Sequence, residues 1–461
     1  MKNLITIFLS LVLLDAAQRV YAATITVSSI ADLQAAIARS VPGDVIILSK
    51  GIYSTGADIT IDKKGTAGKP ITIEGQGLGE TELTGAGGFS IVSPAEYIII
   101  KGFRFTHLCS KARTGSGTRF CQWTHNIFQN SGEGEYLTIA GDDHQIDYNT
   151  FQSKNTLGRF LAIRGTGNQI AQRLWIHHNY FYDFKRQQGN GAETLQFGLS
   201  GYSLSSSNSV VEYNLFEQCD GENELISVKA SSVILRYNTI RDCPAQFTLR
   251  HGNRCLVYGN YFFNTPGLRI FGDDHVVFSN YFEHCNPAIT VGNGDGEVAD
   301  GAALTSHDRP DRVIIVYNTL VNNVANIIQQ GRKDGLGATH ISFANNLIQG
   351  GGKAAALSGP YTDGIWLNNI LYVVADAGDI PSSGYKTLAP MLSRDAMGTF
   401  HLQKGSPLID AGKGSFPQVT VDMDGQSRKG LMDIGADELS NDAAISHMLG
   451  TNEVGYLATE K

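Results

Sequence analysis

One short pattern recurs along most of this chain: an asparagine stands two residues before an aliphatic or aromatic residue. The asparagines of this pattern are Asn126, Asn149, Asn179, Asn214, Asn238, Asn260, Asn280, Asn318, Asn346 and Asn369. Successive members are 23, 30, 35, 24, 22, 20, 38, 28 and 23 residues apart, which indicates a unit of about 22 residues with insertions. Repetition at this period predicts a solenoid, and the leucine framework of a leucine-rich repeat is absent.

Stacked asparagines can form a hydrogen-bonded ladder inside one turn of successive coils. The residues two positions later would then stack in the core, and the 52 glycines suit a fold with many tight turns. We therefore expect an all-β chain, a β-solenoid, whose repeated asparagines and aromatic residues are structural. The longest insertions fall within residues 149–214 and 280–318, where they would shape a binding face.

The N-terminal end does not follow the repeat. Lys2, the apolar run over residues 4–14 and the Val20-Tyr21-Ala22 sequence are typical of a cleavable signal peptide, and the run is too short to span a bilayer. The expected parts are a signal peptide over residues 1–22, a solenoid domain over 23–440 and a tail of unknown role over 441–461. We expect the protein to be exported, periplasmic or secreted, without a lipid anchor because no cysteine follows the cleavage site.

Two shorter patterns flank the repeats. Ser29 with Asp32 three residues later, followed by LQAAIA, predicts a capped amphipathic helix that would cover the exposed end of the core. Toward the other end, the sequence DMDG from Asp422 to Gly425 resembles part of a calcium loop. The downstream glutamate of such a loop is missing, so we expect a turn there.

The six cysteines have no spacing typical of a zinc site. Cys219, Cys243 and Cys285 each lie five residues after a repeated asparagine, which favours a buried stack in successive coils. An exported protein permits disulfides, and Cys109 and Cys121 are the better candidates for one because both flank a loop.

Three segments in the middle of the chain carry unusual polar residues. They begin at residues 190, 221 and 247 and read NGAETLQFG, GENELISVKA and FTLRHGNR. Each is typical of one strand that ends in a small residue, and equivalent positions of stacked parallel strands lie about 4.8 Å apart. The net charge of −8 argues against a nucleic-acid partner, but a local basic cleft can still bind a polyanion.

Aligning the small residues at the ends of these segments places Asn190 beside Glu222, and Lys229 beside His251. Together with Glu224, this gives oxygen ligands for a hard cation next to basic side chains. Such a group suggests metal-assisted chemistry on an anionic substrate. The alternative is that these are ordinary surface polar residues and that Lys229 is a solvated lysine.

Two further features bear on function. Arg250 stands where other coils carry an apolar residue such as Ile163 or Val228, so it needs a partner, for which a substrate carboxylate would serve. Asp273-Asp274 could be the paired carboxylates of a polysaccharide hydrolase. An identical GDDH sequence contains Asp142-Asp143 in the same phase of the repeat, which favours a turn at both places.

The three segments, the asparagine repeat, GKPITIEG near the N-terminal end and the closing GADE resemble polysaccharide lyase family 6, which contains alginate lyases and chondroitinase B. The resemblance implies a right-handed parallel β-helix over nearly all the mature chain. It also implies that Asn190, Glu222 and Glu224 bind Ca²⁺, that Lys229 is the general base and that Arg250 is the general acid.

The activity that the resemblance implies is β-elimination on alginate, which leaves a 4,5-unsaturated uronate end. Calcium would neutralise the uronate carboxylate and make the neighbouring C5 proton easier to remove. His251 and Arg269 are expected to bind substrate, the latter because it lies outward one coil later. The alternatives are a dermatan-type glycosaminoglycan lyase, a glycoside hydrolase and a non-catalytic polysaccharide-binding solenoid.

Overall fold

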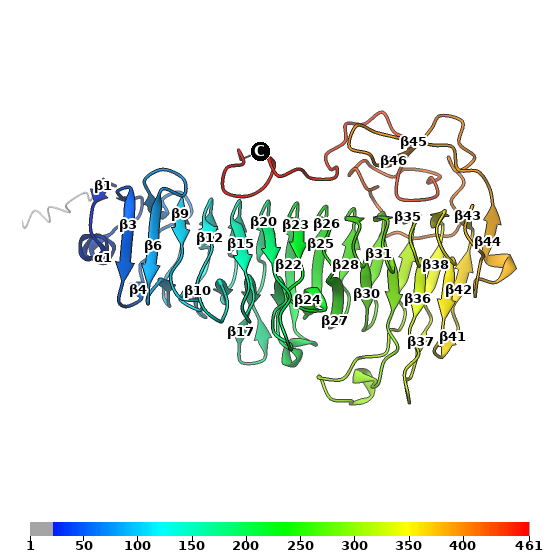
Figure 1. Ribbon diagram of the computed structural model, residues 1–461, viewed down its shortest axis with the longest axis horizontal. Coiled ribbons are helices and arrows are strands. Elements are labelled where there is room, and N and C mark those ends of the chain that lie inside the picture. Colours follow the sequence, from blue (N-terminus) through cyan, green and yellow to red (C-terminus); the bar gives the residue numbers. More distant parts are fainter. Residues whose placement is uncertain (1–21, 461) are drawn as a thin grey trace, which may run out of the picture.

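The structure is a computed structural model that describes residues 22–460, so the expected signal peptide lies outside them but for its last residue. Its regular structure is almost entirely β. The strands form three long parallel sheets of 14, 12 and 14 strands, stacked along one axis (Figure 1). The expected parallel β-helix is therefore confirmed.

The two 14-stranded sheets run from β1 (Thr24–Val27) to β42 (Ile365–Leu367) and from β3 (Gly51–Thr55) to β44 (Tyr385–Thr387). The 12-stranded sheet consists of β4 (Ile59–Ile61), β7 (Phe89–Ile91), β10 (Ala112–Thr114), β13 (Leu137–Ile139), β16 (Leu161–Ile163), β21 (Leu195–Phe197), β24 (Glu224–Lys229), β27 (Gln246–His251), β30 (Leu268–Ile270), β33 (Ile289–Val291), β36 (Ile327–Gln329) and β40 (Ala355–Leu357). Most strands are short, and each pairs with the equivalent strand of the next coil, as the repeat predicts.

The asparagines form a continuous ladder. Asn214 donates its backbone N–H and its side-chain Nδ2 to Oδ1 of Asn238, at 3.1 and 3.0 Å. The same pair of bonds joins every successive member from Asn126 to Asn369. All ten are buried, so their amides satisfy backbone groups that water cannot reach. The predicted ladder is confirmed.

The aromatic residues two positions later also stack, as expected. Ring centroids are 4.7 Å apart between Phe128 and Phe151, 4.9 Å between Phe151 and Phe181, and 4.6 Å between Phe181 and Phe216. The planes are nearly parallel, and such pairs contribute about 0.5–1.5 kcal/mol beyond their buried area. The ladder and the stack together fix the register of successive coils.

Helix α1 (Ile30–Arg39) covers the N-terminal end of the core, as Figure 1 shows. Ser29 caps it, because its Oγ accepts a hydrogen bond from the backbone N–H of Asp32 at 3.1 Å. Leu33 and Ile37 on its inner face are buried. The predicted capping helix is thus present. None of the helices formed by residues 22–460 is long and apolar enough to cross a membrane.

The candidate disulfide between Cys109 and Cys121 is not formed, because all six cysteines are free and buried. Cys109 Sγ donates to the carbonyl of Gly132 at 3.1 Å, and Cys121 Sγ to that of Arg119 at 3.4 Å. Each thiol therefore has a backbone partner in its own part of the core. The sequence could show only that both residues flank a loop.

The cysteine stack is present in part. Cys219 donates its backbone N–H to Cys243 Sγ at 3.4 Å, so these two thiols lie in successive coils. Thr265 occupies the equivalent position in the next coil, where its Oγ1 donates to the carbonyl of Cys243 at 2.5 Å. Cys285 follows one coil later and is also buried.

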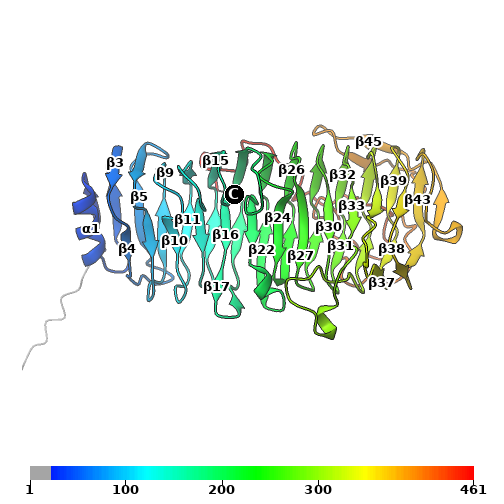
Figure 2. The ribbon, with the colours of Figure 1, turned by 60° about the horizontal axis from the view of Figure 1, so that its bottom comes forward.

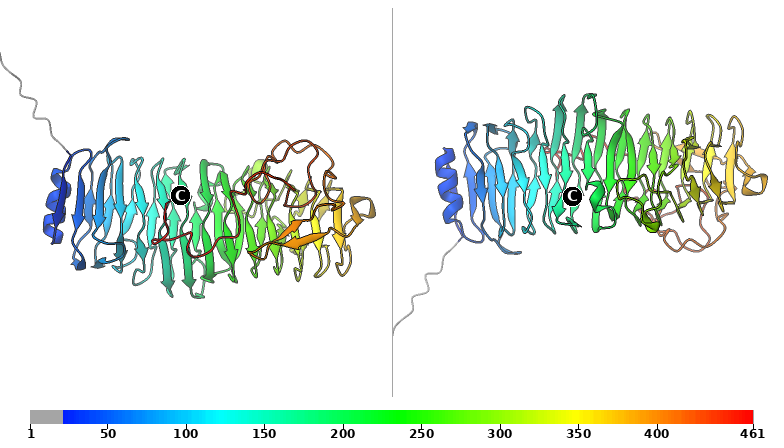
Figure 3. Two further views of the ribbon diagram at one scale, coloured as in Figure 1. Left: turned by 90° about the horizontal axis from the view of Figure 1, so that it is seen from above. Right: turned by 90° about the horizontal axis from the view of Figure 1, so that it is seen from below.

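The C-terminal part of the chain folds back over the 14-stranded sheet that begins with β3. Residues 441–460 run along the outside of this sheet (Figure 1; Figure 3, left). The backbone N–H of Leu449 donates to Thr239 Oγ1 at 2.9 Å, and that of Tyr456 to Thr150 Oγ1 at 3.2 Å. The tail, whose role the sequence left unknown, is thus packed against the body of the β-helix.

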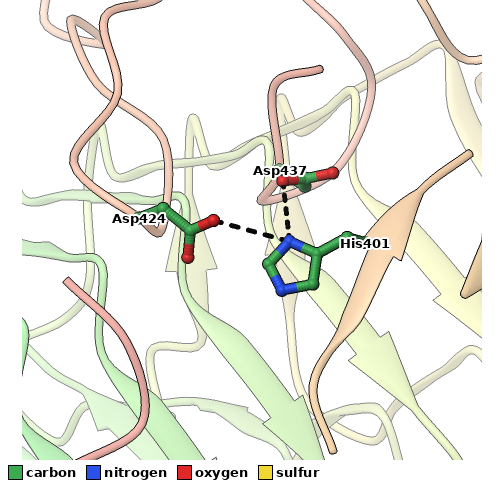
Figure 4. A group of neighbouring side chains, drawn as sticks. All are labelled: His401, Asp424 and Asp437. Atoms are coloured by element: carbon green, nitrogen blue, oxygen red, sulfur yellow. Dashed lines mark hydrogen bonds and ion pairs between the residues drawn. The ribbon is translucent and has the colours of Figure 1, made fainter. Parts of the chain in front are cut away.

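The DMDG sequence forms the expected turn, and Asp422 Oδ1 accepts backbone hydrogen bonds from Asp424 and Gln426 at 3.0 and 2.7 Å. The side chain of Asp424 lies beside His401 of β46 (Phe400–Leu402) and Asp437, as Figure 4 shows. His401 Nδ1 is 3.1 Å from Asp437 Oδ1 and 3.4 Å from Asp424 Oδ2. This group joins a hairpin and two turns of the C-terminal region.

Candidate active site

The three segments with unusual polar residues meet at one cavity of about 620 Å³. Its wall consists of Arg186, Gln187, Gln188, Gly189, Asn190, Glu193, Glu222, Asn223, Glu224, Lys229, Arg250, Arg269 and His307. Six of the seven residues predicted for the site line it, and His251 does not. Residues 186–190 and His307 come from the two long insertions, as expected for loops that shape a binding face.

A second hollow of about 270 Å³ adjoins the cavity and shares Arg269 and His307 with it. It is also lined by Arg332, from the segment after β36. The two hollows meet at these shared residues, and Arg250, Arg269 and Arg332 are among the residues that line them. Several arginines in adjoining hollows suit a polymer with more than one anionic group.

Strand β27 is irregular where it contributes to the cavity. Val228 pairs with Leu249, whereas the next residue, Lys229, pairs with His251, so Arg250 is the extra residue of a β-bulge. Leu249 in turn pairs with Ile270 and occupies the apolar position. The expectation that Arg250 replaces an apolar core residue is therefore wrong. The bulge adds Arg250 to the strand, and bulges commonly re-aim a side chain next to a site.

The alignment of the first two segments is also off by one residue. Phe197 pairs with Val228, so Gly198 lies at the level of Lys229 and not of Ala230. Asn190 is an exposed residue of the loop before β21 and reaches the cavity wall from there. It lies in the same cavity as Glu222, although not at an equivalent position of the coil.

Three carboxylates lie at the centre of the site, and one of them was not predicted. Glu193, Glu222 and Glu224 each place one carboxylate oxygen within 4.8 Å of the others. All three are buried. Glu193 lies three residues after Asn190 and just before β21. The sequence signal that could have indicated it is a lone acidic residue directly before a buried strand.

Each carboxylate is held in a different way. Glu222 Oε2 accepts hydrogen bonds from the backbone N–H groups of Gly191 and Ala192, at 2.6 and 3.3 Å. Ser227 Oγ donates to Glu224 Oε2 at 2.6 Å. Strand β24 thus fixes Glu224, and the loop before β21 fixes Glu222.

The electrostatics of Glu193 and Glu222 differ. Burial opposes ionisation of Glu193, but Arg159 and Lys229 outweigh it and hold the pKa of this carboxyl below its usual value. Burial raises the pKa of Glu222, and the negative charge of Glu193 raises it further. Within residues 22–460 no lysine or arginine forms an ion pair with Glu222, so its charge lacks a direct counterion.

The basic side chains face these carboxylates. Lys229 Nζ is 3.3 Å from Glu193 Oε1, and Arg250 Nε is 3.3 Å from Glu224 Oε1. Arg269 also forms an ion pair with Glu224 Oε1. Burial lowers the pKa of Arg250 from its usual value. A lysine, two arginines and three carboxylates therefore share one wall of the cavity.

Two histidines lie nearby. His251 is only 2% exposed, and burial together with the charges of Arg250 and Lys229 lowers its pKa to about 3, so it is neutral. Its Nδ1 is buried without a hydrogen-bond partner. His307 lines the cavity and is 3.4 Å from Asp295 through Nδ1. His251 lies behind the cavity wall, next to Lys229. Its contact with substrate therefore stays a prediction.

The donor set fits a hard divalent cation. Three buried carboxylates converge, Glu222 has no basic partner among the described residues, and Asn190 lies in the same wall. Oxygen ligands of this kind are those that Ca²⁺ takes in proteins. Glu193, Glu222, Glu224 and Asn190 are the residues that would hold such an ion.

The two Asp-Asp pairs lie elsewhere, because none of their residues lines the 620 Å³ cavity. Asp143 and Asp274 have φ angles of 60° and 56°, in the left-handed region that tight turns use. The preference for turns over hydrolase carboxylates agrees with this geometry.

Comparison with known proteins gives a consistent result. The sequence profile of the family described as chondroitinase B matches residues 27–348. The structure of the alginate lyase AlyGC is similar, with 25% identity and a TM-score of 0.74 over 83% of this chain and 56% of that chain. This chain thus spans a little over half the length of AlyGC. No curated protein sequence matches it.

Two further solved structures share the fold. One is a mannuronic-acid-specific family 6 lyase from human gut microbiota, with 24% identity and a TM-score of 0.68 over 79% of this chain and 90% of that chain. The other is a family 6 alginate lyase in complex with a trisaccharide, with 20% identity and a TM-score of 0.66 over 84% of this chain and 92% of that chain.

Proposed function

This chain belongs to the chondroitinase B family, polysaccharide lyase family 6, and from that membership we propose that it cleaves alginate by calcium-assisted β-elimination. The observation that carries the proposal is the cavity, in which Lys229 and Arg250 face three convergent carboxylates. A hydrolase would need an acid and a second carboxylate flanking the bond, with no requirement for a lysine. A base beside cation ligands suits proton removal next to a carboxylate.

The chain's own residues would perform the elimination as follows. Lys229 Nζ, when neutral, takes the C5 proton of a uronate, and the electrons of that C–H bond form the C4–C5 double bond. The C4–O bond breaks, and its oxygen receives a proton from Arg250 or from a water that Arg250 orients. Arginine is a very weak acid, and protonation by a water that Arg250 orients gives the same product. The product carries a 4,5-unsaturated uronate at its new end.

A divalent cation at Glu193, Glu222, Glu224 and Asn190 would supply charge neutralisation at the uronate carboxylate. Arg250 adds positive charge on the same side, where charge develops as the C5 proton leaves. Arg269 is placed to hold the carboxylate of a neighbouring sugar, because it borders both hollows. Tight contact with several carboxylates would set the register of the polymer.

Two similarities to known proteins bear on the choice of substrate. The alginate lyase AlyGC is 25% identical over 83% of this chain. The family profile is named for chondroitinase B, which makes dermatan sulfate the second candidate. Both polymers carry the uronate carboxylate that the arginines would recognise, so the cavity geometry does not choose between them.

One assay separates the candidate functions. Purified protein with Ca²⁺ is incubated with mannuronate-rich, guluronate-rich and alternating alginate and with dermatan sulfate, and the ultraviolet absorbance of unsaturated ends is followed. We expect a rise on at least one alginate. A rise on dermatan sulfate alone would replace the substrate, and cleavage without absorbance would indicate a hydrolase. Binding without cleavage would indicate a non-catalytic solenoid.

A further inference from the structure

The chain contains two copies of one turn, and the copies differ in the surroundings of their first aspartate. The GDDH sequences that begin at residues 141 and 272 both place their second aspartate in a left-handed conformation. In both, Nδ1 of the histidine accepts a hydrogen bond from a backbone N–H at 3.0 Å. The backbone is therefore equivalent, and any difference between the first aspartates comes from what surrounds them.

The first aspartates have different surroundings. Asp142 has a side chain that is 36% exposed, and its Oδ1 accepts a hydrogen bond from the backbone N–H of Gln172 at 2.9 Å. Asp273 has a side chain that is only 7% exposed, and its Oδ1 is buried without a hydrogen-bond partner. A buried carboxylate oxygen without a donor costs free energy, so something should compensate it.

The segment that encloses Asp273 is the loop over residues 293–312, which protrudes from the β-helix with helix η2 (Val298–Asp300) in it (Figure 2). The loop returns two acidic residues to Asp273. Glu297 and Asp308 each place a carboxylate oxygen so that the three oxygens lie within 4.8 Å of one another. Three carboxylates from two distant parts of the chain thus converge at the base of the loop.

The positive charge nearby does not balance these carboxylates. Arg309 forms an ion pair with Glu297 at 2.6 Å. Arg312 is 3.3 Å from Asp273 Oδ2, but it is also shared with Asp274 and Asp311. Two arginines therefore face five carboxylates around this point, namely those of Asp273, Asp274, Glu297, Asp308 and Asp311.

We propose that Asp273, Glu297 and Asp308 form a second binding site for a hard divalent cation of the Ca²⁺ class, which fastens the 293–312 loop to the β-helix. Oxygen-only ligands favour such a cation, and the unpartnered oxygen of Asp273 gives it a preformed ligand. None of the three residues lines the catalytic cavity. The loop carries His307 into the cavity wall, so the ion holds that part of the wall in place.

The test counts bound ions in variants that isolate this site. Glu222→Gln removes the ion of the catalytic cavity, and Asp273→Asn or Asp308→Asn is added to it. Asp142→Asn is the matched control, because it changes the same turn at a place where residues 22–460 form no such carboxylate cluster. Calcium-free full-length proteins are titrated with CaCl₂ in a calorimeter, and bound calcium is counted by elemental analysis after dialysis.

We expect each double variant to bind one ion fewer than Glu222→Gln, and Asp142→Asn to bind as many as the unchanged protein. Calcium should also slow proteolysis of the 293–312 loop in Glu222→Gln at least tenfold, and not in the double variants. Equal ion counts in Glu222→Gln and in a folded double variant would overturn the proposal. Loop proteolysis that calcium leaves unchanged in Glu222→Gln would overturn it as well, whatever the fold of the double variants. Neither readout depends on lyase activity.

Discussion

Lys229 and His251 are paired on neighbouring strands, and so are Val228, one residue before Lys229, and Leu249, two residues before His251. This is possible only because Arg250 is inserted between Leu249 and His251 as a bulge. The insertion brings Lys229 and Arg250 to one point of the wall, and the neutral His251 is buried behind it next to Lys229. Arg250 and His251 could not share a face of a regular strand, since alternate side chains point to opposite faces.

The first prediction concerns Lys229. Lys229→Ala should lower kcat by about 10²–10⁴-fold, the usual contribution of a general base, while KM changes little. Lys229→Arg should fail as well, because a guanidinium stays protonated near neutral pH. Initial rates of unsaturated product on alginate measure both constants. Lys353→Ala, an exposed lysine, is the control. Wild-type turnover in Lys229→Ala would move the base role to another residue.

Arg250 should act on both binding and turnover. Arg250→Ala removes a charge that faces the substrate carboxylate and the leaving oxygen, so we expect kcat to fall about 10²–10³-fold and KM to rise. Arg104→Ala, on a sheet away from the cavity, should change neither constant. Unchanged KM together with unchanged kcat in Arg250→Ala would show that the bulge serves the fold alone.

The sequence predicted the repeat well and the bulge not at all. Asn238 and its equivalents were found because each makes the same bonds in every coil, so that a local signal is repeated ten times. Arg250 was assigned to the wrong position because an inserted residue changes the register without changing the pattern of residue types. Glu193 was missed because its role depends on Glu222 and Glu224, which reach it from the next coil. Contacts between coils with different insertions are set by three-dimensional packing, so the contacting residues are not separated by a fixed number of residues in the sequence.

Glu193 should matter for the cation although sequence spacing did not indicate it. Glu193→Gln keeps the shape of the side chain and removes one of three convergent charges, so calcium should bind at least about tenfold more weakly. Chelation should abolish lyase activity, and added Ca²⁺ should restore it at higher concentrations for the variant. Glu217→Gln is a matched control, because Glu217 also pairs with an arginine, Arg241, at 2.8 Å. Identical calcium dependence of Glu193→Gln and wild type would contradict this role.

The asparagine ladder should contribute measurably to stability. Asn238→Ala removes the acceptor for two donors of Asn214 and leaves them buried. Each unsatisfied group costs about 1–3 kcal/mol, so the free energy of unfolding should fall by several kcal/mol. Asn441→Ala in the exposed part of the tail should have almost no effect. Denaturant unfolding of the three proteins compares them, and equal midpoints would contradict the ladder's role.

The last prediction concerns the pH dependence of stability. Burial alone would lower the pKa of His401, but Asp437, followed by Asp424 and Asp395, raises it to about 9 from 6.5. A histidine whose pKa is raised by folding stabilises the protein fully below pH 6.5 and loses this contribution as pH rises through 9. The loss amounts to at most about 3 kcal/mol, and the side chain is 23% exposed, so screening is limited. Tm should therefore fall between pH 6.5 and pH 9 in the wild type. The decline should be clearly smaller in His401→Gln and in Asp437→Asn. If all three proteins lose the same number of degrees, the His401 group does not govern stability in this range.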